Sequence, residues 1–160
     1  LLHLVQMATR KDPAQRALMS DVINHILFWP RKKYIDFACT VFDRLNSEPE
    51  GSPVKQQLEA YLSQLPELHN WRERVPPCLF EDRTNKRVVA YTTHSDVLRL
   101  IRNKACHYRD LDRRERAVLG SYPDGMYHFF DARFPSLFVC VYEFVLHTLS
   151  NEPCFNNTYF

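Results

Sequence analysis

The amino-acid sequence predicts a single all-α domain, and three observations lead to this prediction. The chain has 160 residues, which is enough for one compact domain with a hydrophobic core. Hydrophobic residues make up 45% of the chain and aromatic residues 13%, a composition that argues against disorder. Only three glycines occur, which disfavours a sheet with tight hairpins and a glycine-lined phosphate loop. The apolar residues instead recur with the spacing of helices along most of the chain.

The first half of the chain contains three expected helices. Residues 21–29 are rich in apolar side chains and stop before Pro30, where a helix is expected to end. Over residues 34–45 the apolar side chains recur at helical intervals. After a polar loop, a polar helix is expected over residues 54–65.

The middle of the chain holds the least regular stretch, residues 69–94. It has paired prolines and no sustained period, with room for a short β-like segment at 87–91. Long loops in compact domains are often functional. A helix is expected over residues 97–108, with Ser95 as its N-cap.

Three helices are expected in the last part of the chain. Residues 112–120 run from an aspartate that can start a helix to a glycine that can stop one. The next helix begins near Pro123, and residues 135–150 are apolar almost all round, which predicts the central buried helix. The aromatic residues expected in the core are Phe28, Trp29, Tyr34, Phe129, Phe130, Phe134 and Phe138.

The helix expected over residues 97–108 has two different sides. At 100° per residue its apolar residues fall within an arc of about 100°, and Arg102 and Asn103 lie opposite them. His107 lies at the edge of the polar side, next to Asn103. This side offers a fixed cation, an amide and a titratable imidazole. The same pattern is also typical of the solvated side of an ordinary amphipathic helix.

Positive charge is concentrated in the middle of the chain. The formal net charge is only +2, but residues 72–109 contain nine basic and four acidic residues, a local charge of +5. A basic middle that carries an arginine, an asparagine and a histidine fits a polyanionic ligand such as RNA.

The cysteine pattern indicates neither a metal site nor a disulfide framework. The five cysteines are odd in number and widely spaced, and no Cys-x-x-Cys pair occurs. We expect reduced, buried thiols in a cytoplasmic protein. No apolar run approaches the length of a membrane span, and nothing at the N-terminus is typical of a signal peptide.

Residues 1–30 resemble the last helices of a protein-kinase C-lobe. The resemblance consists of an Asp-Pro-x-x-Arg turn followed by a segment that ends in histidine and aromatic residues. These residues are Asp12, Pro13, Arg16, His25, Phe28 and Trp29. The glycine-rich loop, the β3 lysine and the His-Arg-Asp and Asp-Phe-Gly motifs are absent, so this chain is not expected to transfer phosphate from ATP.

This kinase tail, together with residues 31–160 that follow it, resembles one family of helical nucleases. Four stretches carry the resemblance: "DPAQR" with "HILFW", "FDRLNSEPEGSPVKQQLE", "DVLRLIRNKACHYRDL" and "LGSYPDGMYHFFDARFPSLFVCVY". They resemble the kinase-extension nuclease (KEN) domain of the inositol-requiring endoplasmic-reticulum stress sensor and of ribonuclease L. The details favour the stress-sensor branch.

The resemblance implies a metal-independent endoribonuclease without a cofactor. In this family the ribose 2′-OH attacks the adjacent phosphate and leaves a 2′,3′-cyclic phosphate and a free 5′-OH. The resemblance assigns the general acid to His107, phosphate binding to Arg102, and the orientation of phosphate or ribose to Asn103. The fourth catalytic residue is expected to be Tyr91, and Trp71 matches an aromatic residue near the active-site loop that contacts the substrate.

Two of these assignments have a structural alternative. Tyr91 lies eleven residues before Arg102, one or two fewer than the family pattern leads us to expect, so it could instead be a core aromatic residue. Trp71 could equally serve in core packing. Cys106 stands where the stress-sensor pattern often has a second histidine, but His107 keeps the matched position.

The resemblance also implies partners. The substrate is expected to be RNA, at an exposed loop where unstacked nucleotides can reach an in-line geometry. Activity is expected to depend on a homodimer formed through the kinase-like and KEN domains. ATP, ADP or another activator would act only through the kinase-like domain. The protein is expected in the cytoplasm, on the cytosolic face of the endoplasmic reticulum if the parent is membrane-anchored. The alternative is a non-catalytic dimerisation or RNA-binding module of the same fold.

Overall fold

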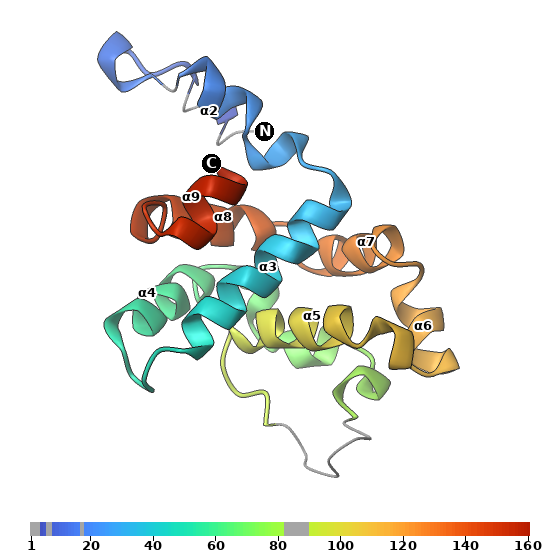
Figure 1. Ribbon diagram of the computed structural model, residues 1–160. Helices are drawn as coiled ribbons and strands as arrows, with labels where there is room; N and C mark the ends of the chain where they lie inside the picture. The colour runs from blue at the N-terminus through green and yellow to red at the C-terminus, as the bar shows by residue number, and fades with distance from the viewer. Residues whose placement is uncertain (1–3, 6–7, 17, 82–89) are drawn as a thin grey trace.

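The computed structural model describes residues 4–5, 8–16, 18–81 and 90–160, and the regular elements in these ranges are helices (Figure 1). The α-helices are α2 (Met19–Ile23), α3 (Arg31–Asn46), α4 (Pro53–Leu62), α5 (Asp96–Cys106), α6 (Arg113–Leu119), α7 (Asp124–Arg133), α8 (Leu137–Thr148) and α9 (Pro153–Tyr159). Short 3₁₀ helices join them. The all-α prediction is confirmed. Of the predicted β-like segment at 87–91, residues 87–89 lie outside the described ranges, and residues 90–91 are not in a strand.

Helix α3 crosses the middle of the molecule and packs against α5, α7 and α8 (Figure 1). It begins directly after Pro30, whose fixed φ suits the position before a helix. Its apolar residues fall on the buried side, as their spacing predicts. They are Tyr34, Ile35, Phe37, Ala38, Val41 and Leu45.

Six of the twelve residues of α8 are buried and five are half-buried, which agrees with the prediction of a central buried helix. It packs on α4 and on α3. Its buried residues include Phe138, Tyr142 and Phe144. The predicted core positions Phe129, Phe130 and Phe134 are buried as well.

A cluster of aromatic rings joins the N-terminal segment to the helical body. The Trp29 ring lies 5.2 Å from Phe37 on α3 and 5.6 Å from Tyr142 on α8, in edge-to-face geometry. The Phe37 ring lies 5.0 Å from Tyr159 on α9. Because the indole N–H of Trp29 also donates to the carbonyl of Asn24 at 2.7 Å, the indole is anchored at both its apolar and polar sides.

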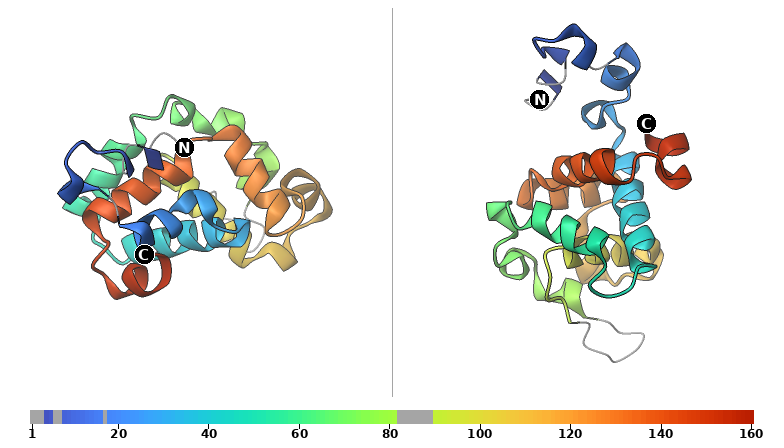
Figure 2. Two further views of the ribbon diagram at one scale, coloured as in Figure 1. Left: turned by 90° about the horizontal axis from the view of Figure 1, so that it is seen from above. Right: turned by 90° about the vertical axis from the view of Figure 1, so that its left-hand side faces the viewer.

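The segment before Trp29 differs from its prediction. The expected helix over residues 21–29 is wrong, because α2 ends at Ile23 and a 3₁₀ helix, Ile26–Phe28, follows. The buried His25 side chain caps that 3₁₀ helix by accepting the amide N–H of Leu27 at 3.2 Å. The prediction of Phe28 as a core residue is also wrong, since 61% of it is exposed. Helix α2 projects away from the body of the molecule (Figure 2).

Both ends of α6 confirm the start and stop signals in its sequence. Asp112 accepts the amide N–H of Glu115 at 2.8 Å, while the Glu115 carboxylate accepts that of Asp112 at 3.0 Å, which forms a capping box. Gly120 ends the helix at φ +71°, a conformation that favours glycine. A Cβ on Gly125 would lie 2.7 Å from the Gly120 Cα, so the turn requires glycine at both positions.

All five cysteines are free thiols, but they are not all buried as predicted. Cys39, Cys78 and Cys140 are half-buried, whereas Cys106 and Cys154 are exposed because they lie on the outer sides of α5 and α9. Within the described ranges, every helix is too short or too polar to cross a lipid bilayer.

The packing of Phe37 predicts a stability difference between two phenylalanines. Phe37→Ala removes a fully buried ring and should lower the free energy of unfolding by about 3–5 kcal/mol. Phe28→Ala is the matched control, because the exposed ring should change it by no more than about 0.5 kcal/mol. Urea unfolding followed by circular dichroism measures both. Equal losses for the two variants would contradict the described core.

Candidate functional site

Helix α5 carries two of the predicted site residues, Arg102 and Asn103, and a third, His107, follows directly after it. Its buried side contains Val97, Leu98 and Ile101, as the sequence pattern predicts, and Arg102 and Asn103 lie on the half-exposed side. Lys104 is buried as well, which is rare for a lysine unless it is paired. The amphipathic α5 therefore holds its polar side chains in a fixed order along the surface.

Two carboxylates, and not the side chain of the N-cap residue, fix the start of α5. Ser95 is the N-cap as predicted, but its side chain makes no capping hydrogen bond. Asp96 accepts the amide N–H groups of residues 92 and 93 at 2.7 and 2.9 Å. Glu59 on α4 accepts those of residues 94 and 95 at 3.0 and 2.9 Å. These four bonds determine the path of the chain immediately after Tyr91.

Arg102 is oriented by a partner on α3. Its Nε donates to Oδ1 of Asp43 at 2.9 Å, and one third of the Arg102 side chain is exposed. Sequence reasoning missed Asp43, because the two residues are 59 positions apart and no local pattern joins them. A phosphate that binds to this guanidinium would compete with the Asp43 carboxylate for it.

His107 is the C-cap of α5 and is open to solvent. Its backbone N–H donates to the carbonyl of Asn103 at 3.2 Å, which closes the last turn of the helix. The imidazole is 65% exposed, and its Nδ1 is 3.7 Å from the Asp110 carboxylate, too far for a hydrogen bond. The ring can therefore meet a ligand from solution. Asn103 lies four residues earlier, the spacing at which side chains on one side of a helix are neighbours.

The thiol of Cys39 faces the same part of α5. Burial raises the pKa of this thiol to about 12, and the nearby Cys106 acts in the same direction. Cys39 therefore remains protonated at neutral pH and is unsuited to act as a base or a nucleophile.

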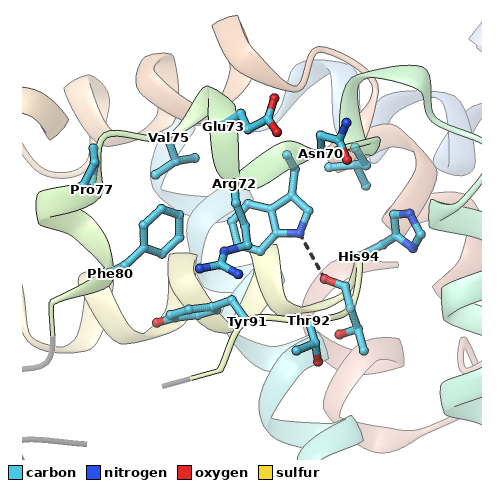
Figure 3. Close-up of a pocket in the computed structure, with 12 residues that line it drawn as sticks. Asn70, Arg72, Glu73, Val75, Pro77, Phe80, Tyr91, Thr92 and His94 are labelled. Carbon is cyan, nitrogen blue, oxygen red and sulfur yellow. Dashed lines mark hydrogen bonds between the residues drawn. The ribbon is translucent and has the colours of Figure 1, made fainter. Parts of the chain in front are cut away.

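Tyr91 and Trp71 meet in an aromatic cluster before α5, and Figure 3 shows Tyr91 with its neighbours there. Both side chains are 4% exposed, and their rings stand perpendicular with centroids 6.0 Å apart. The Phe80 ring lies 5.4 Å from Tyr91, and the indole N–H of Trp71 donates to the carbonyl of Thr93 at 3.0 Å. Both residues are therefore packed like core aromatic residues, the alternative stated above, and both also line a pocket.

This pocket has a volume of about 800 Å³ and is open to solvent. Its aromatic walls come from Trp71, Phe80 and Tyr91, and its polar residues include Asn70, Arg72, Thr92 and His94 (Figure 3). The Arg72 guanidinium carbon lies 5.6 Å from the centroid of the Phe80 ring. Such a surface offers both stacking and hydrogen-bonding groups to a planar ligand.

The predicted site residues form two groups, and Arg99 lies between them. The pocket is lined by Tyr91 and Trp71 and, within the described part of the chain, by none of the three residues on or at the end of α5. The guanidinium carbon of Arg99, one turn before Arg102, lies 5.8 Å from the Tyr91 ring centroid. Nothing in the local sequence pattern indicated this contact between Arg99 and Tyr91.

A buried ion pair ties the end of α5 to α6. Lys104 Nζ lies 2.6 Å from Glu115 Oε1, and the two side chains are only 10% and 7% exposed. The aspartate-to-glutamate spacing of the capping box was a sequence signal for Glu115, but nothing indicated its second partner. Among the described residues, no three histidine, cysteine, aspartate or glutamate side chains gather closely enough to hold a metal ion.

Comparison with known proteins shows to which family the chain is similar. The family described as Ribonuclease 2-5A matches residues 34–159. The serine/threonine-protein kinase/endoribonuclease ire-1 of Caenorhabditis elegans is 33% identical over 156 residues, 98% of this chain and 16% of that protein. The probable serine/threonine-protein kinase ireA of Dictyostelium discoideum is 32% identical over 159 residues, 99% of this chain and 16% of that protein.

The name of a third relative describes its role. The sensor for unfolded proteins in the ER, ire1, of Schizosaccharomyces pombe is 35% identical over 146 residues, 90% of this chain and 14% of that protein. The chain thus spans about one sixth of the length of these relatives. It belongs to the Ribonuclease 2-5A family, the KEN nuclease domains that its sequence motifs resemble.

Proposed function

We propose that this chain is an endoribonuclease domain that cleaves RNA through attack of a ribose 2′-OH on the adjacent phosphate. The products would be a 2′,3′-cyclic phosphate and a free 5′-OH. The observation that carries the proposal is the placement of Arg102, Asn103 and His107 along one open side and end of α5, in a member of a ribonuclease family. This reaction needs a base at the 2′-OH, an acid at the leaving 5′-oxygen, and donors at the phosphate.

His107 supplies the acid in this proposal. Its exposed imidazole can approach the 5′-oxygen and donate a proton to it as the phosphorus–oxygen bond breaks. Arg102 offers donors in a fixed fork to the phosphate, and Asn103 can donate to a phosphate or ribose oxygen. The Asp43 carboxylate would hold the guanidinium in place until the phosphate arrives.

Tyr91 completes the proposed site, together with the pocket that it lines. An unstacked nucleotide would enter this pocket against Trp71, so that the ribose comes near Tyr91. The Tyr91 hydroxyl would then orient or deprotonate the 2′-OH. A phenol is a weak base at neutral pH, so a nearby guanidinium is needed to favour its anion, and Arg99 lies against the ring.

The proposed biological setting follows the relatives. Residues 1–30 would be the last part of a kinase-like C-lobe, and residues 31–160 the nuclease domain. ATP or ADP would then bind only to the kinase-like domain, which in turn would drive formation of the active homodimer. We expect RNA cleavage on the cytosolic side in an unfolded-protein response, because one relative is named a sensor for unfolded proteins in the ER.

A non-catalytic RNA-binding or dimerisation module is the competing proposal. The observation that favours it is the burial of Tyr91 among aromatic rings, which suits a core residue. The open imidazole of His107 favours the enzyme, because a binding module does not need a proton donor there.

His107→Asn should lower the cleavage rate at least about 10²-fold, because it removes the proposed general acid. The rate is measured on a labelled RNA stem-loop at high protein concentration. His128→Asn is the matched control, since His128 is exposed on α7 and lies outside the proposed site. EDTA should leave the wild-type rate unchanged. A His107→Asn rate equal to wild type, or a loss of activity in EDTA that Mg²⁺ restores, would contradict this mechanism.

Tyr91→Phe separates the two roles of Tyr91, because it keeps the ring and removes only the hydroxyl. The proposed role predicts a rate loss of about 10²-fold with little change in melting temperature. Tyr61→Phe provides the control, since Tyr61 is a tyrosine of α4 outside the pocket. Full activity of the Tyr91 variant would show that the Tyr91 hydroxyl has no role in catalysis.

The cleavage rate per mole of protein should rise with protein concentration across the micromolar range. The isolated chain should dimerise weakly, because its basic middle carries a net charge of +5 and two such surfaces repel each other. Fusion to an unrelated parallel dimer should raise the rate further by supplying a high effective concentration. A rate per mole that stays flat from nanomolar to high micromolar protein would overturn the dimer requirement.

A further inference from the structure

The segment that carries His107 into α6 has little regular structure of its own. A single 3₁₀ turn, Tyr108–Asp110, separates the end of α5 from the Asp112 cap of α6. The His107 ring is largely exposed and only approaches Asp110. The location of the imidazole therefore depends on where the backbone of residues 107–112 is held.

Arg116 on α6 holds two carbonyl groups of this segment. Its Nε donates to the carbonyl of Leu111 at 2.7 Å, and its Nη2 donates to that of Arg109 at 2.9 Å. These two bonds come from one planar guanidinium, so they fix the carbonyls relative to each other as well as to α6. A hydrogen bond to a charged donor is stronger than one between neutral groups.

Other contacts hold the ends of the same segment. The buried Lys104–Glu115 pair joins its start on α5 to α6, and the second oxygen of Glu115 accepts the amide N–H of Asp112. The Tyr108 hydroxyl donates to the carbonyl of Gly120 at 2.5 Å. Among these contacts, those of Arg116 bind the middle of the segment, two and four residues after His107.

We propose that Arg116 is a positioning residue for His107, an inference that rests on the proposed role of His107 as general acid. Arg116 does not touch the RNA in this proposal. Through the carbonyls of Arg109 and Leu111 it keeps the 3₁₀ turn closed, and the turn keeps the imidazole at the end of α5. A displacement of about 1 Å at a reacting group can lower a rate about 10²-fold, so this contact can control catalysis from outside the site.

Arg116→Gln tests the proposal, and Arg114→Gln is its matched control. Both changes remove one positive charge from an exposed position of α6, but only Arg116 bonds the carbonyls of the segment. For Arg116→Gln we expect kcat on the RNA stem-loop to fall about tenfold or more, with KM within about twofold. For Arg114→Gln we expect kcat within about twofold of wild type. Arg116→Lys, which can keep one of the two bonds, should fall between wild type and Arg116→Gln.

A double-mutant cycle distinguishes positioning from a general loss of structure. In a chain that already carries His107→Asn, the change Arg116→Gln should lower the remaining rate by less than about twofold, because no general acid is left to misplace. If the loss of rate in the double variant equals the product of the losses in the two single variants, the proposal is overturned. If melting shows that Arg116→Gln is unfolded at the assay temperature, the same cycle is run with Arg116→Lys.

The outcomes separate this inference from the function on which it rests. Wild-type activity in His107→Asn would contradict the proposed function, whatever Arg116 does. A large loss in His107→Asn together with full activity in Arg116→Gln would leave the proposed function intact and overturn the positioning role. The ring protons of His107 give a readout without RNA, because their NMR signal should change in Arg116→Gln and stay unchanged in Arg114→Gln.

Discussion

The packing of α5 against α3 is the interaction on which the rest of the structure depends. It buries the apolar side of α5 and so decides which of its side chains remain at the surface. The same contact brings Asp43 to Arg102, although the two residues are far apart in the chain. Asn103 and His107 then follow along the open side and at the end of the helix. One packing event therefore determines both the core and the order of the candidate catalytic groups.

Carboxylates hold α5 at both of its ends. At its start, Glu59 and Asp96 bind four successive amides and so guide the chain that leads out of Tyr91. At its end, Glu115 receives the buried Lys104 and caps α6. Both halves of the candidate site, the aromatic pocket and the His107 turn, are thus fixed by charged groups that make no contact with substrate in our proposal. Precise placement of a few groups is what catalysis by positioning requires.

The features that local patterns could predict are those set by near neighbours in the chain. The period of α3 and α5, the all-round apolar character of α8, and the two end signals of α6 were readable in this way. Partners that meet only after folding were not: Asp43 and Glu59 lie 59 and 35 positions from the groups they bind. Phe28 was wrongly predicted to be a core residue, because its exposure depends on the end of α2 at Ile23, which no sequence signal indicated.

The central claim is that the ribose 2′-OH of the substrate is the nucleophile that the α5 residues serve. The direct measurement is cleavage of two RNA stem-loops that differ only by a 2′-deoxy sugar at the scissile nucleotide, with the product ends identified by mass spectrometry. The account predicts cleavage of the all-ribose substrate to a 2′,3′-cyclic phosphate and a 5′-OH, and no cleavage at the 2′-deoxy position. Cleavage at the 2′-deoxy position, or a product with a 5′-phosphate, would contradict it.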